Sequence, residues 1–127
     1  MIELVFHSHN ELVKFHDELY KRGYSKWENT SGLFRYDYIF QKLFKDDLGK
    51  KYYIDFEFYD YTKTSHPSEG VRVCFGTTFN NDGDEPNKLH NTIWIEADFD
   101  SIDQAEQLVE TLWKTSNSQY YELWSEC

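Results

Sequence analysis

The feature of this sequence that most restricts its fold is a long β-hairpin. Two β-prone runs, residues 34–45 and 51–61, flank the turn-forming segment 46–50, whose sequence is DDLGK. A three-residue loop with glycine in the left-handed conformation is a common hairpin connection, and here it pairs Asp46 with Lys50. Because the turn sets the register of the ladder, the residue numbers of every further pair also sum to 96.

This register gives the hairpin two faces of different character. One face is a nearly continuous apolar and aromatic stripe, formed by the pairs Phe44–Tyr52, Lys42–Ile54, Phe40–Phe56 and Tyr38–Phe58. The opposite face is formed by the pairs Leu43–Tyr53, Gln41–Asp55, Ile39–Glu57, Asp37–Tyr59 and Arg35–Tyr61. A slip of one residue would mix the two faces, so the turn and the pattern support the same register.

Two amphipathic helices are predicted, one before the hairpin and one near the end of the chain. The sequence SHNE at residues 8–11 is a capping box that starts a helix over about 9–22, and Gly23 suits the left-handed residue after its last turn. The sequence SIDQ at residues 101–104 repeats this pattern ahead of an amphipathic helix over about 102–116.

Three further strands are predicted at residues 2–7, 71–79 and 92–99, and residues 119–125 are interpreted as a final edge strand or a docked tail. The chain has 10 Phe, 10 Tyr and 4 Trp in 127 residues, which is enough to fill a rigid core. We therefore predict one α+β domain over residues 1–127, with a single antiparallel sheet of four to six strands and two helices packed on one face. The predicted order is β-α-β-β-β-β-α, with a possible final β.

The charge of the chain excludes several classes of partner. The formal net charge is −10, and residues 61–127 contribute most of it. Nonspecific binding to nucleic acid or to anionic membranes depends on basic side chains, so we expect neither as a direct partner. No run approaches the roughly 18–20 apolar residues of a membrane span, and the first residues lack the basic region of a signal peptide. We expect a cytoplasmic protein.

No motif in the sequence identifies a chemical reaction. Neither a phosphate-binding glycine motif nor a serine nucleophile motif is present. His7 and His9 have the spacing of two metal ligands on a strand, but Ser8 between them is better interpreted as a helix cap, and no third ligand is apparent. Cys74 is interpreted as a small buried residue and His16 as a semi-buried histidine with its hydrogen bonds satisfied. We assign no catalytic residue, metal or cofactor, and leave enzymatic activity open.

The outward face of the predicted sheet combines aromatic rings with carboxylates, which is typical of a protein-binding surface. The carboxylates would steer a basic partner, such as a nucleic-acid enzyme whose groove is blocked by anions placed where phosphates bind. An exposed aromatic face would also suit a homodimer. Alternatively, tyrosine is simply a good strand residue and the C-terminal segment covers this face. The predicted partner-binding residues are Tyr53, Asp55, Glu57, Tyr59, Tyr61, Trp94, Glu96 and Asp98.

In size, acidity and aromatic content, the chain resembles phage-encoded anti-defence inhibitors and bacterial immunity proteins, a likeness of class that assigns no residue. The first hypothesis is accordingly a small acidic inhibitor that occludes a basic partner. The alternative is a small-ligand or nucleotide-binding domain with an aromatic cleft, for which Trp27, Tyr36 and Tyr38 are the candidate stacking residues. A third hypothesis is a hydrolase that uses His7 or His9 together with carboxylates.

Overall fold

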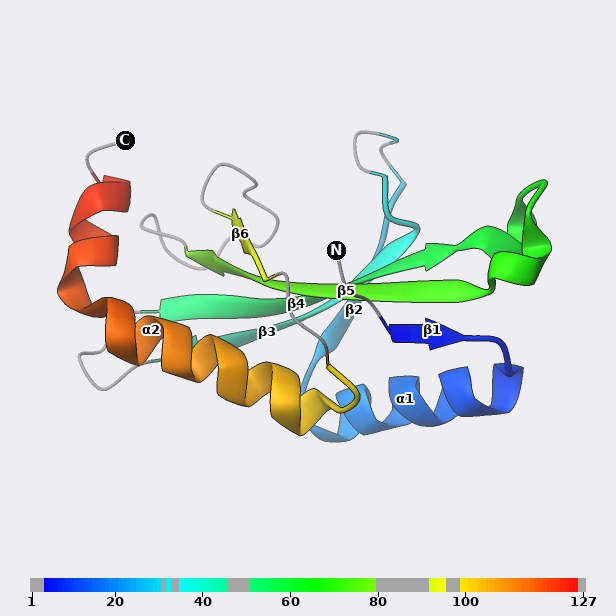
Figure 1. Ribbon diagram of the computed structural model, residues 1–127, viewed down its shortest axis with the longest axis horizontal. Coiled ribbons are helices and arrows are strands. Elements are labelled where there is room, and N and C mark those ends of the chain that lie inside the picture. The colour runs from blue at the N-terminus through cyan, green and yellow to red at the C-terminus, as the bar shows by residue number, and fades with distance from the viewer. Residues whose placement is uncertain are drawn as a thin grey trace.

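The structure, a computed structural model, describes residues 4–30, 32, 35–45, 51–79, 92–95 and 99–125, without the side chains of 79, 92–94 and 115–125. Its elements are one antiparallel sheet and two α-helices, and both helices lie against the same face of the sheet (Figure 1). This arrangement confirms the predicted fold class, an α+β chain with one face of a single sheet covered. We call the covered face the inner face and the opposite one the outer face.

Within the described ranges the sheet has six strands, which is inside the predicted range. The strand order is β1-β5-β4-β3-β2, and β6 pairs with β5 as well. Every pairing is antiparallel. The strands are β1 (Leu4–Phe6), β2 (Ser25–Glu28), β3 (Tyr38–Lys45), β4 (Lys51–Asp60), β5 (Val71–Phe79) and β6 (Thr92–Trp94).

The predicted hairpin register is confirmed over the whole β3–β4 ladder. Its pairs run from Tyr38–Phe58 to Lys45–Lys51, all with residue numbers that sum to 96. The two outermost predicted pairs lie beyond the ladder, and the prediction was wrong there. At this end the backbone N–H of Asp37 donates to the carbonyl of Phe58 at 2.8 Å, and the Asp37 carboxylate accepts from the N–H of Asp60 at 2.6 Å. The β3–β4 ladder thus ends at Asp37, and the chain before Asp37 leaves the plane of the sheet (Figure 1).

Helix α1 (His9–Lys21) begins and ends as predicted. The Ser8 hydroxyl accepts from the N–H of Glu11 at 3.5 Å, and Gly23 has the left-handed φ of 91°. Helix α2 also begins as predicted, because the Ser101 hydroxyl accepts from the N–H of Gln104 at 3.1 Å.

Helix α2 (Ile102–Ser125) continues much further than expected. It has 24 residues, and residues 119–125, predicted as a final edge strand or docked tail, form its last turns. The segment is rich in aromatic residues that favour strands, but no glycine or proline follows Ile102 to end the helix. The possible final β of the prediction is therefore wrong.

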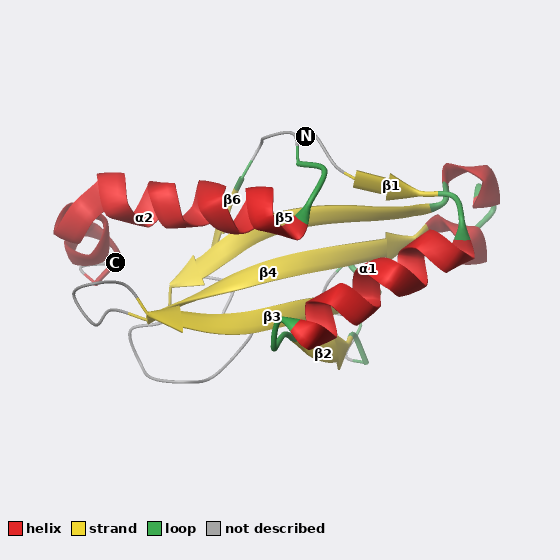
Figure 2. Cartoon of the chain, turned by 90° about the horizontal axis from the view of Figure 1, so that it is seen from below, coloured by secondary structure: helices red, strands yellow, loops and turns green. Residues whose placement is uncertain are grey.

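The core lies between the inner face and the two helices (Figure 2). From α1, the ring of Phe15 contacts Phe56 and Phe58 at centroid distances of 6.0 Å. From α2, the buried Trp113 donates its indole N–H to the hydroxyl of Thr77 at 3.0 Å. The aromatic stripe of the hairpin is thus the floor of the core, as the register predicted. The largest fully buried side chains of the core on β3, β4 and β5 are Phe40, Phe56, Phe58 and Phe75.

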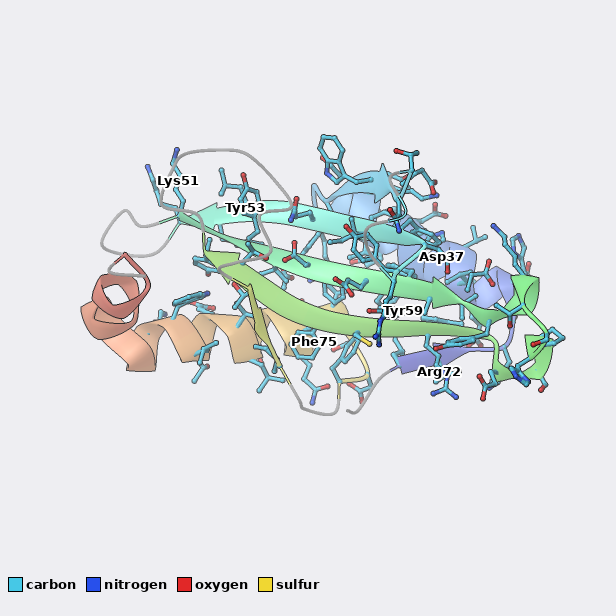
Figure 3. The ribbon with its side chains drawn as sticks, turned by 90° about the horizontal axis from the view of Figure 1, so that it is seen from above. Asp37, Lys51, Tyr53, Tyr59, Arg72 and Phe75 are labelled. Atoms are coloured by element: carbon cyan, nitrogen blue, oxygen red, sulfur yellow. The ribbon has the colours of Figure 1, made fainter. Side chains whose placement is uncertain are left out.

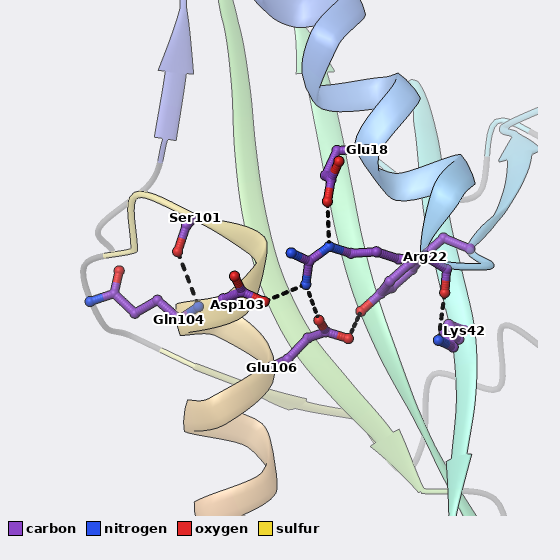
Figure 4. Close-up of polar contacts among 8 residues, drawn as sticks. Glu18, Arg22, Lys42, Ser101, Asp103, Gln104 and Glu106 are labelled. Carbon is purple, nitrogen blue, oxygen red and sulfur yellow. Dashed lines mark hydrogen bonds and ion pairs between the residues drawn. The ribbon is translucent and has the colours of Figure 1, made fainter.

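One arginine holds the two helices together. The guanidinium of Arg22 donates to Glu18 on its own helix at 2.9 Å, and to Asp103 and Glu106 on α2 at 2.6 Å each (Figure 4). Glu106 also accepts from the hydroxyl of Tyr24 at 3.1 Å. These contacts raise the pKa of the Arg22 guanidinium, chiefly through the hydrogen bond to Asp103. Much of the acidity at the start of α2 is therefore neutralised within the fold.

Candidate functional site: the outer face of the sheet

The outer face carries most of the residues predicted to bind a partner, but three of them are buried. Tyr53, Asp55 and Glu57 alternate along β4 on this face, as predicted, and their relative exposures are 6%, 2% and 4%. The expectation that they point into water is wrong. Tyr59 lies at the other end of the same strand (Figure 3), Tyr61 follows it, and both are half-buried. Carboxylates sealed from water cannot steer a basic protein.

Asp55 is held by hydrogen bonds from the two neighbouring strands. The side-chain amide of Gln41 on β3 donates to one carboxylate oxygen, and the hydroxyl of Thr78 on β5 donates to the other, both at 2.5 Å. Burial raises the pKa of Asp55 to about 6, although these two hydrogen bonds favour the charged form. The buried carboxyl therefore lies within a polar network and not at a contact surface.

Glu57 is paired with the phenol two residues further along β4. The hydroxyl of Tyr59 donates to the Glu57 carboxylate at 2.5 Å. Burial raises the pKa of Glu57 to about 7; the hydrogen bond from Tyr59 opposes the shift, and the nearby Asp55 adds to it. Burial and the same carboxylate also raise the pKa of the Tyr59 phenol. Two adjacent carboxyl groups on the outer face thus bind protons close to neutral pH.

The segment between β2 and β3 places a buried tyrosine near these carboxyls. It rises above the outer face (Figure 1), and its Tyr36 is buried to 4% exposure. The pKa of this phenol is raised to about 12, first by burial and then by the charges of Glu57 and Asp55, so the ring lies near both carboxyls. A side chain from an irregular segment thus lies near the two strand carboxyls, and no local sequence signal predicts this position.

A pocket opens at the end of the outer face, beside the buried Glu57. Its volume is about 570 Å³, within the range of small-molecule sites. Four stretches of chain form it: the residues before β3, the end of β4, the 3-10 helix η1 (Tyr61–Lys63) with the residue after it, and β5. We call this the outer pocket, and its lining residues are Arg35, Asp37, Tyr59, Asp60, Tyr61, Lys63, Thr64 and Cys74.

The walls of the outer pocket are fixed by contacts around its two tyrosines. The guanidinium of Arg72 lies 5.4 Å from the centre of the Tyr61 ring, in cation–π contact. Arg72 is also directly opposite Tyr59 across the β4–β5 ladder. Cys74 is buried, as predicted, and lies opposite Glu57 in the same ladder. Both rings are therefore held in place by the sheet and by η1, while Arg35 and Lys63 add positive charge at the rim.

The remaining predicted residues are not brought together. Trp94 lies in β6 without a described side chain, and Glu96 and Asp98 lie outside the described residues. The aromatic cleft predicted from Trp27, Tyr36 and Tyr38 does not form. Tyr38 belongs to the inner core, Tyr36 to the outer face, and Trp27 to the sheet edge, where it is exposed.

The predicted histidine roles have different outcomes. His16 is half-buried, its ring nitrogen Nε2 lies 2.8 Å from the hydroxyl of Tyr38, and its ring stacks on Phe40, as expected. Burial is the main cause of its lowered pKa. His7 and His9 are exposed at the start of α1. Within the described part of the chain, no three histidine, cysteine or acidic side chains form a metal-binding group.

A second concavity lies on the opposite side of the molecule, between β1, α1 and the start of α2. It has a volume of about 450 Å³ and an apolar floor that includes Phe6, Phe15 and Ile102. Its rim carries three acidic side chains, from α1 and from the residues before α2, and two basic ones. We call this the helix groove, and its charged residues are Glu11, Lys14, Glu18, Arg22 and Asp100.

Comparison with protein-family models, with curated proteins and with solved structures finds no match to this chain. Among the described residues, no helix is long and apolar enough to cross a membrane. The functional argument therefore rests on the two concavities and on the charges around them.

Proposed function

We propose that this chain binds a small planar organic anion, of the size of a nucleoside monophosphate, in the outer pocket. The observation that carries the proposal is the pocket itself, in which two tyrosine rings and two cationic side chains come together within about 570 Å³. Two carboxylates line it as well, and Asp60 lies 3.8 Å from the ammonium of Lys63, so Arg35 is the main cation for an anionic group. Tyr59 and Tyr61 provide aromatic surface for a planar group. Arg35 and Lys63 provide hydrogen-bond donors for an anionic group.

The charge of the outer face supports an anionic occupant. The outward-pointing charged side chains of β3, β4 and β5 are three cations and two carboxyls. Both carboxyls are buried, and their pKa values are raised to about 6 and about 7. The net charge of −10 therefore does not describe these three strands, whose outward charges outside the buried carboxyls are positive, although Asp37 and Asp60 add two carboxylates at the pocket. The cations are Lys45, Lys51 and Arg72, and the carboxyls are Asp55 and Glu57.

Thermal unfolding with defined probes tests the proposal. The four ribonucleoside 5′-monophosphates are added at rising concentration, with adenosine and inorganic phosphate as single-feature controls. A ligand at about 100 times its Kd stabilises the folded state by about 2.7 kcal/mol, a Tm rise on the order of 10 °C for a chain of this size. We expect at least one monophosphate to raise Tm more than either control compound.

Two pocket variants and two matched controls locate the site. Arg35→Gln removes a cation and Tyr61→Leu removes a ring, so both should abolish the rise in Tm. Lys14→Gln and Tyr20→Leu make the same chemical changes at exposed positions on α1 and should keep it. A protein that no monophosphate stabilises at millimolar concentration, or pocket variants that respond like the wild type, would contradict the proposal.

The helix groove favours a second candidate function, the binding of a basic protein segment. Its apolar floor fits the apolar face of an amphipathic helix, and its acidic rim is complementary to basic flanking residues. In this function, carboxylates such as Glu11 and Asp100 would occupy positions that phosphates take on a nucleic-acid-binding partner. Occlusion of a basic partner would thus use the helix layer instead of the outer face.

A designed amphipathic peptide of leucine and lysine tests this second function by fluorescence anisotropy. Binding should weaken as salt rises and should be lost in Glu11→Lys combined with Asp100→Lys. Glu69→Lys combined with Glu110→Lys, both at exposed positions outside the groove, makes the same change in net charge and serves as the control. Equal loss in both double variants would show attraction to overall charge and would exclude the groove as the site.

A further inference from the structure

Strand β2 forms an open edge of the sheet. It is the last strand of the order β1-β5-β4-β3-β2, and within the described residues it pairs with β3 alone (Figure 2). All four of its residues, Ser25–Glu28, are exposed. An open edge of this kind presents unpaired backbone groups and is a template for another strand.

The hydrogen-bonding pattern shows which residues present those groups. The backbone N–H of Asn29 donates to the carbonyl of Asp37 at 3.0 Å, and this pair continues the β2–β3 register. Hydrogen-bonded and non-hydrogen-bonded pairs alternate along an antiparallel ladder. Trp27, two residues earlier, therefore directs its backbone groups to β3. Lys26 and Glu28 direct their N–H and C=O groups away from the sheet.

These two residues allow three symmetric registers with a second copy of β2. An antiparallel partner can place Lys26 opposite Lys26, Glu28 opposite Glu28, or Lys26 opposite Glu28. The first two registers place like charges directly opposite one another, which is unfavourable. The third places opposite charges together twice, and it forms four backbone hydrogen bonds because both hydrogen-bonded pairs are complete. Charge selects one register.

Exposed apolar side chains also lie at the β2 edge, which supports association there. In the third register Trp27 faces Trp27 of the second copy at a non-hydrogen-bonded position, where cross-strand side chains are closest. Trp27 is 45% exposed on the outer side of β2. The ring of the exposed Tyr20 contacts Phe40, which pairs with Lys26, and Leu43 is exposed on β3 just beyond the end of β2. Of the four large apolar side chains exposed in the described part of the chain, three thus lie at this edge.

We propose that two copies of this chain associate through β2, paired antiparallel around a two-fold axis at Trp27, with Lys26 of each copy opposite Glu28 of the other. The axis is perpendicular to the sheet, so the two sheets join into one and both helix layers lie on the same side. The proposal is independent of the outer pocket, which lies at other elements.

Charge exchange between two variants tests this register. The mass in solution is measured by sedimentation over a concentration range up to about 0.5 mM, since four-residue strands make a small interface. Lys26→Glu alone and Glu28→Lys alone each place like charges opposite one another and should weaken the dimer by about tenfold or more. An equimolar mixture of the two variants restores every opposite-charge pair, so it should form a heterodimer. The double variant Lys26→Glu with Glu28→Lys should form a dimer by itself.

The test also needs a variant with the same change in net charge away from β2, and a measurement that each variant is folded. Lys114→Glu changes the net charge as Lys26→Glu does, on the exposed side of α2, and should leave the mass unchanged. Circular dichroism shows whether each variant is folded. A wild type that remains monomeric at the highest concentration overturns the proposal. So does a dimer that survives both single substitutions, or a mixture of the two variants that stays monomeric.

Discussion

Replacing Glu57 with glutamine should stabilise this protein at alkaline pH. The glutamate is 4% exposed, and burial raises its pKa to about 7, from an ordinary value of 4.5. The folded state therefore holds a proton that the unfolded state releases at lower pH. This contribution to stability is fully present below the unfolded pKa and is lost as pH rises through the folded pKa. Glutamine has no proton to lose, and its Oε1 can still accept the hydrogen bond from Tyr59.

The expected size follows from the two pKa values. A shift of one pKa unit corresponds to about 1.36 kcal/mol, so the wild type should lose about 2–3 kcal/mol of unfolding free energy from this group between about pH 5 and about pH 8. His16 acts in the opposite direction, because its lowered pKa means that stability falls when the pH drops below its unfolded pKa of 6.5. The difference between wild type and variant isolates Glu57, since His16 is common to both.

Urea unfolding at several pH values measures this difference. At about pH 5 the two proteins should differ only by the effect of the amide itself, and by about pH 8 the variant should gain about 2–3 kcal/mol relative to that baseline. Glu69→Gln, a partly exposed acid outside the network, provides the control and should show no such gain. A constant difference across the pH range would refute the argument, because it would mean that Glu57 is not titrating from a buried site.

Three further substitutions test the packing that supports the two sites, each by thermal or urea unfolding. Gly70→Ala should cost about 2–4 kcal/mol, because Gly70 has a φ of 72° and an added Cβ would lie 2.4 Å from the carbonyl oxygen of Phe6; an unchanged Tm would exclude this contact. Arg22→Met should cost about 1–2 kcal/mol by leaving three carboxylates without their shared cation, whereas Lys114→Met, which removes one exposed ion pair, should have little effect. Trp113→Phe should cost about 1–3 kcal/mol, since it removes the hydrogen bond to the buried Thr77 and leaves a small cavity; a cost below that of exposed substitutions would contradict the packing of α2.

The parts of the fold that were predicted correctly depend on interactions between residues close in sequence. The hairpin turn at 46–50 and the alternation of apolar residues agree on one register, and the structure has that register. The capping boxes at Ser8 and Ser101 mark two helix starts for the same reason. By contrast, β2 was missed because its sequence, SKWE, has no apolar alternation, and its pairing with β3 depends on residues ten or more positions away.

The candidate site was only partly predictable because burial depends on residues distant in sequence. Alternation placed Tyr53, Asp55 and Glu57 on the face away from the helices, and they are there. Alternation does not reveal that Tyr36, from an irregular segment, lies near the carboxyls on that face. Within the outer pocket, Tyr59 and Tyr61 were both among the predicted partner-binding residues. Cys74 joins them through the pairing of β5 with β4, and Lys63 through η1, for whose position beside β5 the sequence offers no local signal.

The buried glutamate and the outer pocket should be coupled through Tyr59. This phenol lines the pocket and donates to Glu57, so a negative charge on Glu57 lies just behind the pocket wall. Protonation of that carboxylate removes a repulsion that we expect to be about 1 kcal/mol for an anion several ångströms away, a factor of about five in affinity. For the monophosphate identified by thermal unfolding, the Kd of the wild type should therefore rise relative to that of Glu57→Gln as the pH increases from about 6 to about 8. The comparison at each pH cancels the titration of the phosphate itself, and calorimetry measures both constants. A ratio of the two Kd values that stays constant over this range would show that the glutamate and the pocket act independently.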